Sequence, residues 1–208
     1  MKDEKMKAGS KKGEYMTSLF GDHLVLKTHP RIVFRGLIDT LEAEVIEAQV
    51  LASDSGEGEY CLWLGEILDY LRALMAAEVK ETPLSPPLLF GMDAEEIHRC
   101  SHQVCGLEGK STLPVFTQGP LASRLNTLRA KVREVELFAV RVFGPGKYTQ
   151  EKGTQKAGDT KESHQVPGTG KEEREDIILA LNRLSSAIWW LFCNYVANNP
   201  DILAKARR

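Results

Sequence analysis

Apolar residues recur at steps of three and four along several segments of this chain. This spacing places them on one face of an α-helix, because the helix repeats every 3.6 residues. The clearest case follows Pro120, a residue suited to the first turn of a helix. Its apolar positions are Leu121, Leu125, Leu128, Val132, Val135, Ala139 and Val142. No alternating pattern typical of a β-strand extends beyond a few residues, so the sequence predicts an all-α fold.

Three more long segments have the same helical spacing. The first helix is predicted from the apolar stripe that runs from Phe34 to Ala48, and 37–52 contains no glycine or proline. The second follows a turn at 53–59 and ends near Lys80. A last helix is predicted from about Glu173 to the residues before Pro200. Helices joined in this way bury their apolar faces best as an antiparallel bundle.

A shorter helix is predicted over 93–104. Asp93 suits its N-cap, and Glu96 lies three residues later, which is the spacing of a capping box. The helix carries His98 and His102, whose spacing of four could hold zinc or iron. Short helices also commonly carry solvated histidines, so both interpretations stay open and no metal site is assigned.

The chain length favours one domain. Residues 1–16 are Lys-rich and polar and are predicted to be a disordered tail, which leaves 17–208 as a single helical-bundle domain. Within it, 144–173 contains no Leu, Ile, Phe or Trp. Such a segment cannot offset the entropy lost on ordering, so we expect a long flexible, disordered loop before the last helix.

The charge balance excludes some classes of partner. The chain has 27 basic and 29 acidic residues and no long basic run, so general attraction to nucleic acid is not expected. It shows neither a signal-peptide core nor the roughly 18 uncharged apolar residues of a membrane span. Four cysteines without a Cys-x-x-Cys pair predict free thiols. We therefore expect a cytoplasmic protein without a membrane partner.

Charged residues lie beside the apolar face of the helix after Pro120. A rotation of about 100° per residue brings Arg129, Arg133 and Glu136 into one narrow sector. Ionised groups next to a core cost several kcal/mol unless they are paired or meet a ligand. Asp39, on the first helix, is one candidate partner. A salt-bridge network between helices and an anion site both remain open.

The last helix carries polar residues on one flank. Asn182 and Ser185 lie there together, although helix propensity gives no reason for a mid-helix asparagine. A satisfied polar contact and a ligand contact are the two interpretations. Further along, Trp189, Trp190 and Phe192 are interpreted as packing residues rather than as a platform for a ligand.

Three blocks in this order, THPRIVFRGLIDTLEAEV, LNTLRAKVREVE and DIILALNRLSSAIWW, resemble the ATP:cob(I)alamin (corrinoid) adenosyltransferases. The segment GMDAEEIHRCSHQV and the later LPVF are similar to the ethanolamine-utilisation type. The resemblance extends from Thr17 over nearly all of the chain except the low-complexity loop. It implies a ferritin-like bundle of about five helices that forms a homotrimer with intersubunit active sites. The implied reaction transfers the 5′-deoxyadenosyl group of ATP to the cobalt of reduced cobalamin and releases triphosphate.

The resemblance also implies roles for individual residues. Asp39 matches an acidic residue of the family, and Arg129 matches the arginine that pairs with it across the subunit boundary. Together with Arg133 they form the expected catalytic set. The expected ATP ligands are Lys27, Arg31, Arg133, Glu136, Asn182 and Arg183. For the apolar cobalamin pocket, the nearest candidates are Phe116 and Leu113, with ordinary loop anchors as the alternative.

The chain also departs from the family pattern. The Gly-rich phosphate loop of the propanediol type is reduced to Gly13 in SKKGEYM, and Leu137 and Ser186 replace a family arginine and aspartate. The N-terminal cysteine-rich metal region of the ethanolamine type is not matched either. Side chains, with Mg²⁺ bridging phosphate oxygens, are therefore expected to bind the triphosphate.

Two alternatives to the enzyme remain open. One is a non-catalytic trimeric protein that binds adenosylcobalamin for delivery or sensing, and the other is a metal-binding scaffold that uses His98 and His102. The partners implied for the enzyme are a reductase or a cobalamin-dependent enzyme, and a bacterial microcompartment is an implied location.

Overall fold

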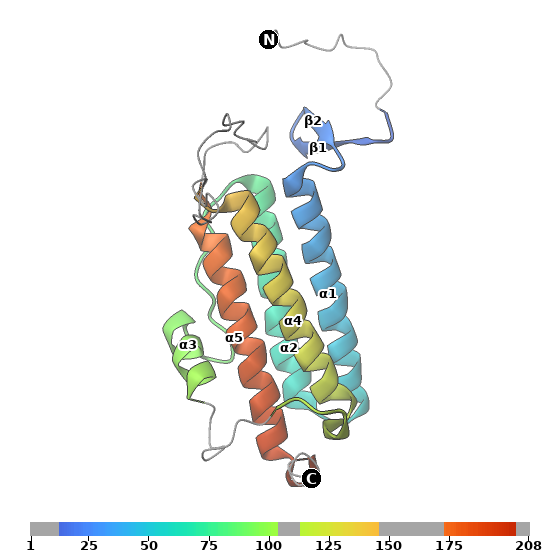
Figure 1. Ribbon diagram of the computed structural model, residues 1–208, viewed down its shortest axis with the longest axis vertical. Helices are drawn as coiled ribbons and strands as arrows, with labels where there is room; N and C mark the ends of the chain where they lie inside the picture. Colours follow the sequence, from blue (N-terminus) through green and yellow to red (C-terminus); the bar gives the residue numbers. More distant parts are fainter. Residues whose placement is uncertain (1–12, 104–112, 146–172, 203–208) are drawn as a thin grey trace, which may run out of the picture.

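Four long helices form a bundle in the computed structural model, which describes residues 13–103, 113–145 and 173–202 (Figure 1). A short helix lies outside the bundle against its last helix, and a 3₁₀ turn, η1 (Phe116–Gln118), precedes the third long helix. The predicted all-α bundle of about five helices is confirmed. The helices are α1 (Pro30–Asp54), α2 (Gly58–Lys80), the short α3 (Ala94–His102), α4 (Gly119–Phe143) and α5 (Glu175–Asn198).

The long helices pack in a ring, in the order α1, α2, α5 and α4. Figure 1 shows that neighbours in this ring are antiparallel, because α1 and α5 run in one direction and α2 and α4 in the other. The chain must therefore return along the bundle between α2 and α4, and this connection carries α3. A bundle with one long crossover is the arrangement of ferritin-like folds.

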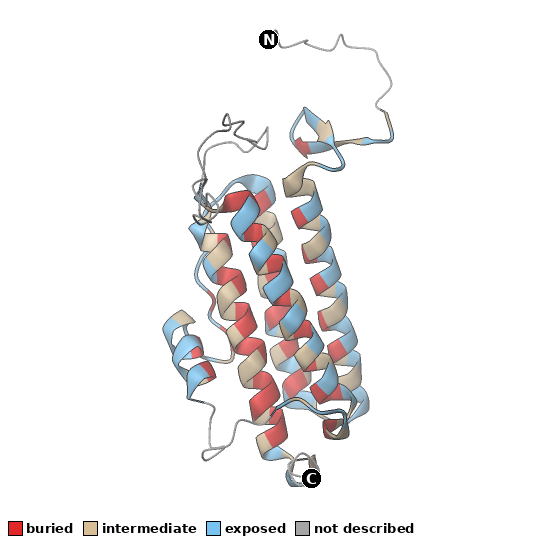
Figure 2. Ribbon diagram, viewed as in Figure 1, coloured by how far each residue is buried: buried red, intermediate tan, exposed pale blue. Residues whose placement is uncertain are grey.

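The core consists of the apolar stripes that the sequence predicts. Figure 2 shows that the buried positions follow the inward faces of the long helices. On α4, every apolar position predicted from the spacing is buried. On α1, the stripe from Phe34 through Ile38, Leu41 and Val45 to Ala48 has at most 1% of its surface exposed. Because these stripes face the core, the polar flanks of α4 and α5 lie outside it and can line a ligand pocket.

Helix α5 is the most apolar α-helix of the described chain. By length and composition alone it could cross a membrane, but 56% of its most apolar window is buried inside the bundle. Each 18-residue window of α5 also contains Arg183, whose side chain donates a hydrogen bond to Asn182. Its apolar character is accounted for by packing against α2, α3 and α4.

An antiparallel hairpin precedes α1 and was not predicted. It consists of β1 (Met16–Phe20) and β2 (His23–Leu26), joined by a turn in which Gly21 has a φ of 47°. Strands of five and four residues are too short to show a convincing alternation in the sequence. The predicted tail over 1–16 therefore meets a strand at its last residue, while 1–12 lies outside the described residues.

The start of α1 extends beyond the predicted stripe, whose first residue is Phe34. The helix begins at Pro30, which occupies the first turn, where a proline needs no hydrogen-bond partner for its nitrogen. Gly36 does not interrupt the helix. It lies on an exposed face of the helix with no neighbouring atom within 4 Å of the place a Cβ would take, so the helix continues through it.

One buried carboxylate ties the hairpin to the bundle. Glu78 of α2 has no exposed surface and accepts hydrogen bonds from Nε of Arg31 and Nε of Arg35, both on α1. Arg35 also donates from Nη1 to the carbonyl oxygen of Leu19 in β1 at 2.8 Å. This cluster fixes the hairpin against the first turns of α1 and the end of α2.

Candidate functional site

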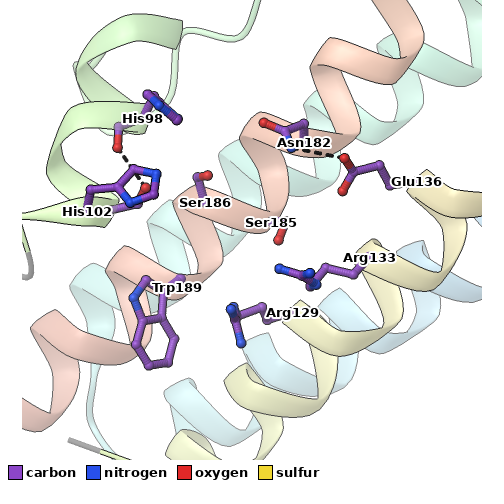
Figure 3. A pocket seen from close by; sticks show the side chains of 10 residues that line it. His98, His102, Arg129, Arg133, Glu136, Asn182, Ser185, Ser186 and Trp189 are labelled. Atoms are coloured by element: carbon purple, nitrogen blue, oxygen red, sulfur yellow. Dashed lines mark hydrogen bonds between the residues drawn. The ribbon is translucent and has the colours of Figure 1, made fainter. Parts of the chain in front are cut away.

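A polar pocket of about 430 Å³ lies between α3, α4 and α5 (Figure 3). Its volume is within the range of small-molecule sites. Helix α4 contributes Arg129, Arg133 and Glu136. These residues are spaced by four and three, so they point from one face of the helix. The predicted sector of charges beside the α4 stripe is confirmed, and it forms one wall of the pocket.

The two arginines of this wall have no carboxylate partner in the described part of the chain. The guanidinium carbon of Arg129 lies 4.6 Å from the ring centroid of Trp189, which is a cation–π contact. Burial, and then repulsion from Arg133, lower the pKa of Arg129 from its usual value, although an arginine stays charged. The pocket therefore holds positive charge that an anionic ligand would neutralise.

Asn182 of α5 is fixed between two side chains. Its Nδ2 donates to Oε1 of Glu136 at 2.9 Å, and its Oδ1 accepts from Nη1 of Arg183 at 2.6 Å. Figure 3 shows the first of these bonds spanning from α5 to α4. Arg183 continues toward α3, where Nη2 lies 3.8 Å from a carboxylate oxygen of Glu95. The polar flank of α5 is thus both a contact between helices and part of the pocket lining.

Trp189 also lines the pocket, although the sequence interpretation gave it only a packing role. It does pack, since its ring stacks on Phe192 with centroids 5.2 Å apart, but it also contacts Arg129. Its position seven residues after Asn182 and four after Ser185 places it on the polar flank. That spacing was a usable signal in the sequence.

Trp190, the neighbouring tryptophan, packs as predicted. Its ring centroid lies 5.4 Å from that of Trp63 on α2 and 5.5 Å from that of Phe90 in the crossover connection. The ring therefore holds α5, α2 and the crossover together, away from the pocket.

Arg183 contacts Asn182 without lining the pocket itself, and three other residues predicted for the site belong to elements that do not line the pocket. Asp39 is exposed on α1 and has no ion pair among the described residues. Lys27 is exposed just after β2. Arg31 is engaged at the hairpin end, where Nη1 donates to Glu81 at 2.6 Å in addition to the bond with Glu78. Of the predicted catalytic and ATP-binding residues that the structure describes, those of α4 and α5 are brought together within one chain, beside His98 and His102 of α3.

Phe116 and Leu113 lie next to the start of α4, also outside the pocket. Their side chains are 90% and 71% exposed. A phenylalanine with so little contact does not anchor a loop within its own chain. Their place in a cobalamin pocket stays a prediction, and the exposure favours it over the alternative of ordinary loop anchors.

Within the described ranges, no group of three or more His, Cys, Asp or Glu side chains could hold a metal ion. His98 and His102 do lie together, with ring centroids 4.6 Å apart. Two imidazoles are fewer ligands than the four of a structural zinc site. The described cysteines, Cys61, Cys100 and Cys193, form no disulfide bond with one another, and Cys105 lies outside the described residues.

The fold and the site define a helical-bundle protein with a polar pocket whose two arginines have no carboxylate partner among the described residues. The family model described as cobalamin adenosyltransferase matches residues 9–195, and the chain belongs to this family.

Two relatives are similar over most of the chain. The corrinoid adenosyltransferase EutT of Salmonella typhimurium (strain LT2) is 30% identical over 199 residues, which is 95% of this chain and 65% of that protein. The corrinoid adenosyltransferase EutT of Escherichia coli (strain K12) is 29% identical over 192 residues, which is 92% of this chain and 62% of that protein. The chain therefore spans slightly less than two thirds of the length of these relatives. No solved structure matches the chain significantly.

Proposed function

We propose that this protein transfers the 5′-deoxyadenosyl group of ATP to the cobalt of reduced cobalamin. In this reaction the electron pair of cobalt(I) attacks the 5′ carbon of ATP, the bond from that carbon to oxygen breaks, and intact triphosphate leaves with the electrons. Cobalt(I) is itself the nucleophile and no proton is removed, so the protein has to position the reactants and stabilise a polyanion. Membership of the family and similarity to proteins named corrinoid adenosyltransferase support this proposal.

The observation that carries the proposal is the pair of uncompensated arginines. Arg133 and Arg129 present positive charge to a pocket in which Glu136 is the carboxylate of the lining, and that carboxylate already accepts from Asn182. A triphosphate supplies the missing negative charge at Arg133, whose guanidinium fork meets two phosphate oxygens at once. Arg133 and Asn182 are our first choices for nucleotide contacts, with Glu136 and Arg183 holding Asn182 in place.

The remaining residues of the proposed site come from an adjacent subunit of a trimer. Asp39 is exposed and lacks an ion-pair partner among the described residues, and Arg129 lacks a carboxylate within the described part of its own chain. We therefore pair the two across adjacent subunits, which leaves Arg133 as the arginine that binds the triphosphate. Lys27 of a neighbouring subunit is then a phosphate ligand. Arg31 is proposed for the same role, but it reaches a phosphate only by giving up its bond to Glu81.

Cobalamin is proposed to bind where Phe116 and Leu113 expose their apolar side chains at the start of α4. Mg²⁺ would be held mainly by phosphate oxygens, as is usual for this ion, because Glu136 is the only carboxylate among the described residues that line the pocket. We further propose a cytoplasmic location, with a microcompartment as a more specific setting, and a reductase or a cobalamin-dependent enzyme as partner.

An anaerobic assay with ATP and chemically reduced cobalamin tests the proposal. Formation of the carbon–cobalt bond is followed by its spectral change. We expect turnover by the wild type and a loss on the order of 100-fold in Arg133→Ala, because a donor to the leaving group is removed. Arg141→Ala is the matched control, since Arg141 is exposed on the same helix and is not part of the pocket lining. Corrinoid binding without turnover by the wild type would indicate the delivery or sensing protein instead.

A further inference from the structure

The third wall of the pocket comes from α3 and has no role in the proposed chemistry so far. Helix α3 buries Ile97 completely and Ser101 almost completely, and it packs against α5. His98 and His102 each follow one of these residues by one position. A rotation of about 100° per residue therefore turns both imidazoles to the same side, which is the side of the pocket (Figure 3).

Several contacts hold α3 in this place. Asp93 and Glu96 form a complete capping box at its N-terminus, with Asp93 Oδ1 accepting from the backbone N–H of Glu96 at 2.9 Å. Arg183 of α5 lies 3.8 Å from Glu95. Ser101 donates to the carbonyl oxygen of His98 at 2.8 Å, so its hydroxyl group is already used within the helix. The imidazoles are the side chains of α3 that remain free to contact a ligand in the pocket.

Across the pocket, the charged groups that face the imidazoles are Arg129, Arg133 and Glu136 of α4. Two cations against one hydrogen-bonded carboxylate oppose the binding of a bare metal ion and favour an anion. An imidazole always carries at least one N–H donor, and a phosphate oxygen is a strong acceptor. The chemistry of this wall therefore complements that of the α4 wall.

We propose that His98 and His102 bind the anionic part of the ligand by donating hydrogen bonds to phosphoryl oxygens from the side opposite Arg129 and Arg133. For the nucleotide, this identification rests on the proposed function, whereas binding of a polyphosphate does not. Helices α3 and α4 then contact the triphosphate from opposite sides of the pocket.

Titration calorimetry with inorganic triphosphate tests this inference on the full chain. In the double variant His98→Ala/His102→Ala we expect the triphosphate affinity to fall at least about tenfold, since two hydrogen bonds to a charged group are lost. The double variant His98→Gln/His102→Gln keeps an amide donor at each position and should regain part of this affinity. Arg99→Ala is the matched control, because Arg99 is exposed on α3 and does not line the pocket. Its affinity should equal that of the wild type.

The inference is overturned if the alanine variant binds triphosphate as tightly as the wild type. It is also overturned if the glutamine variant is as weak as the alanine variant, or if the wild type does not bind triphosphate. Failure of the proposed function has a different signature. In that case the wild type binds triphosphate and the alanine double variant loses this affinity, but no adenosyl transfer from ATP is observed.

Discussion

Glu78 is a carboxylate without exposed surface, held between two guanidinium groups. Removing one partner of a buried ion pair is costly, because the other charge is left without compensation. Arg31 and Arg35, with 18% and 14% of their side chains exposed, have few water contacts to replace this carboxylate. Glu78 is therefore the residue on which the N-terminal end of the bundle depends.

Replacing Glu78 by glutamine keeps its shape and removes its charge. We expect the free energy of unfolding to fall by about 3 kcal/mol, measured by urea denaturation. The control is Glu42→Gln, which removes the charge from the more exposed contact of Glu42 with Arg72 at 3.6 Å and should cost less than about 1 kcal/mol. An equal loss in the free energy of unfolding in the two variants would show that the buried charge of Glu78 contributes no more than an exposed ion pair.

We expect the stability of the protein to depend on pH through Asp176, which lies near the start of α5. Burial raises its pKa, but hydrogen bonds from Arg174 and from the backbone N–H of Leu84 outweigh burial, so the pKa of Asp176 lies below its usual 3.8. A carboxyl with a lowered folded pKa stabilises the protein above its unfolded pKa, and this stabilisation is lost as the pH falls through the folded value.

The variant Asp176→Asn should therefore be less stable than the wild type at pH 7. The difference should shrink as the pH falls below about 4, because the carboxyl group of the unfolded wild type then becomes protonated. It should disappear once the pH is below the lowered pKa of the folded protein. Urea denaturation at pH 7, 5 and 3 measures it. A stability difference that is the same at all three values would mean that the charge of Asp176 contributes nothing.

The residues of the pocket could be predicted from the sequence only where they share a helix. Arg129, Arg133 and Glu136 were found because their spacing alone places them on one face. The bond between Asn182 and Glu136 joins residues 46 positions apart, and that between Arg35 and Glu78 joins residues 43 apart. Such pairs depend on how helices pack, which single-helix periodicity does not determine.

At the scale of elements, α3 is the part of the site that depends most on local interactions. It has nine residues, and Ile97 and Ser101 are its buried residues, so little packing supports it. An isolated helix of this length is not stable in water. Its N-terminal capping box therefore contributes a large share of what keeps it folded.

Asp93→Ala should destabilise α3 by about 1 kcal/mol, because the first-turn amides lose their acceptor. Hydrogen exchange of the amides in 94–102 measures this effect, and we expect faster exchange there with unchanged exchange in α5. Asp69→Ala, an exposed position on α2, is the control. Unchanged exchange in α3 of Asp93→Ala would show that packing against α5 alone maintains the helix.

The same local rules explain which elements were predictable. Long helices have enough turns for the periodicity to be unmistakable, and the capping box identified α3 despite its length. The hairpin of β1 and β2 was missed because its two short strands depend on Gly21 for the turn and on Arg35 for attachment. Neither contribution is visible as a periodic pattern.

For the whole molecule, α1 and α4 leave apolar side chains uncovered. Val50 of α1 is 53% exposed and Leu137 of α4 is 66% exposed. Exposed apolar residues on α1, the helix that also carries the exposed Asp39, and on α4 are consistent with the proposed trimer. A single-chain sequence pattern predicts apolar faces toward a core, but it does not distinguish a core from a subunit interface.

Asp39→Ala should weaken assembly or ATP affinity, because it leaves Arg129 of the adjacent subunit without its proposed partner. Analytical ultracentrifugation and ATP titration of the variant measure these two effects. The control is Asp54→Ala, an exposed carboxylate at the end of the same helix. A variant with unchanged trimer and unchanged ATP affinity would contradict the proposed pair.

The most direct test of the proposed site is a crystal structure of the protein grown with ATP. We expect nucleotide density in the pocket between α3, α4 and α5, with phosphate oxygens on Arg133 and a contact to Asn182, at a boundary between two subunits. Nucleotide bound elsewhere, or a pocket of this kind facing solvent in a monomer, would contradict the proposed function.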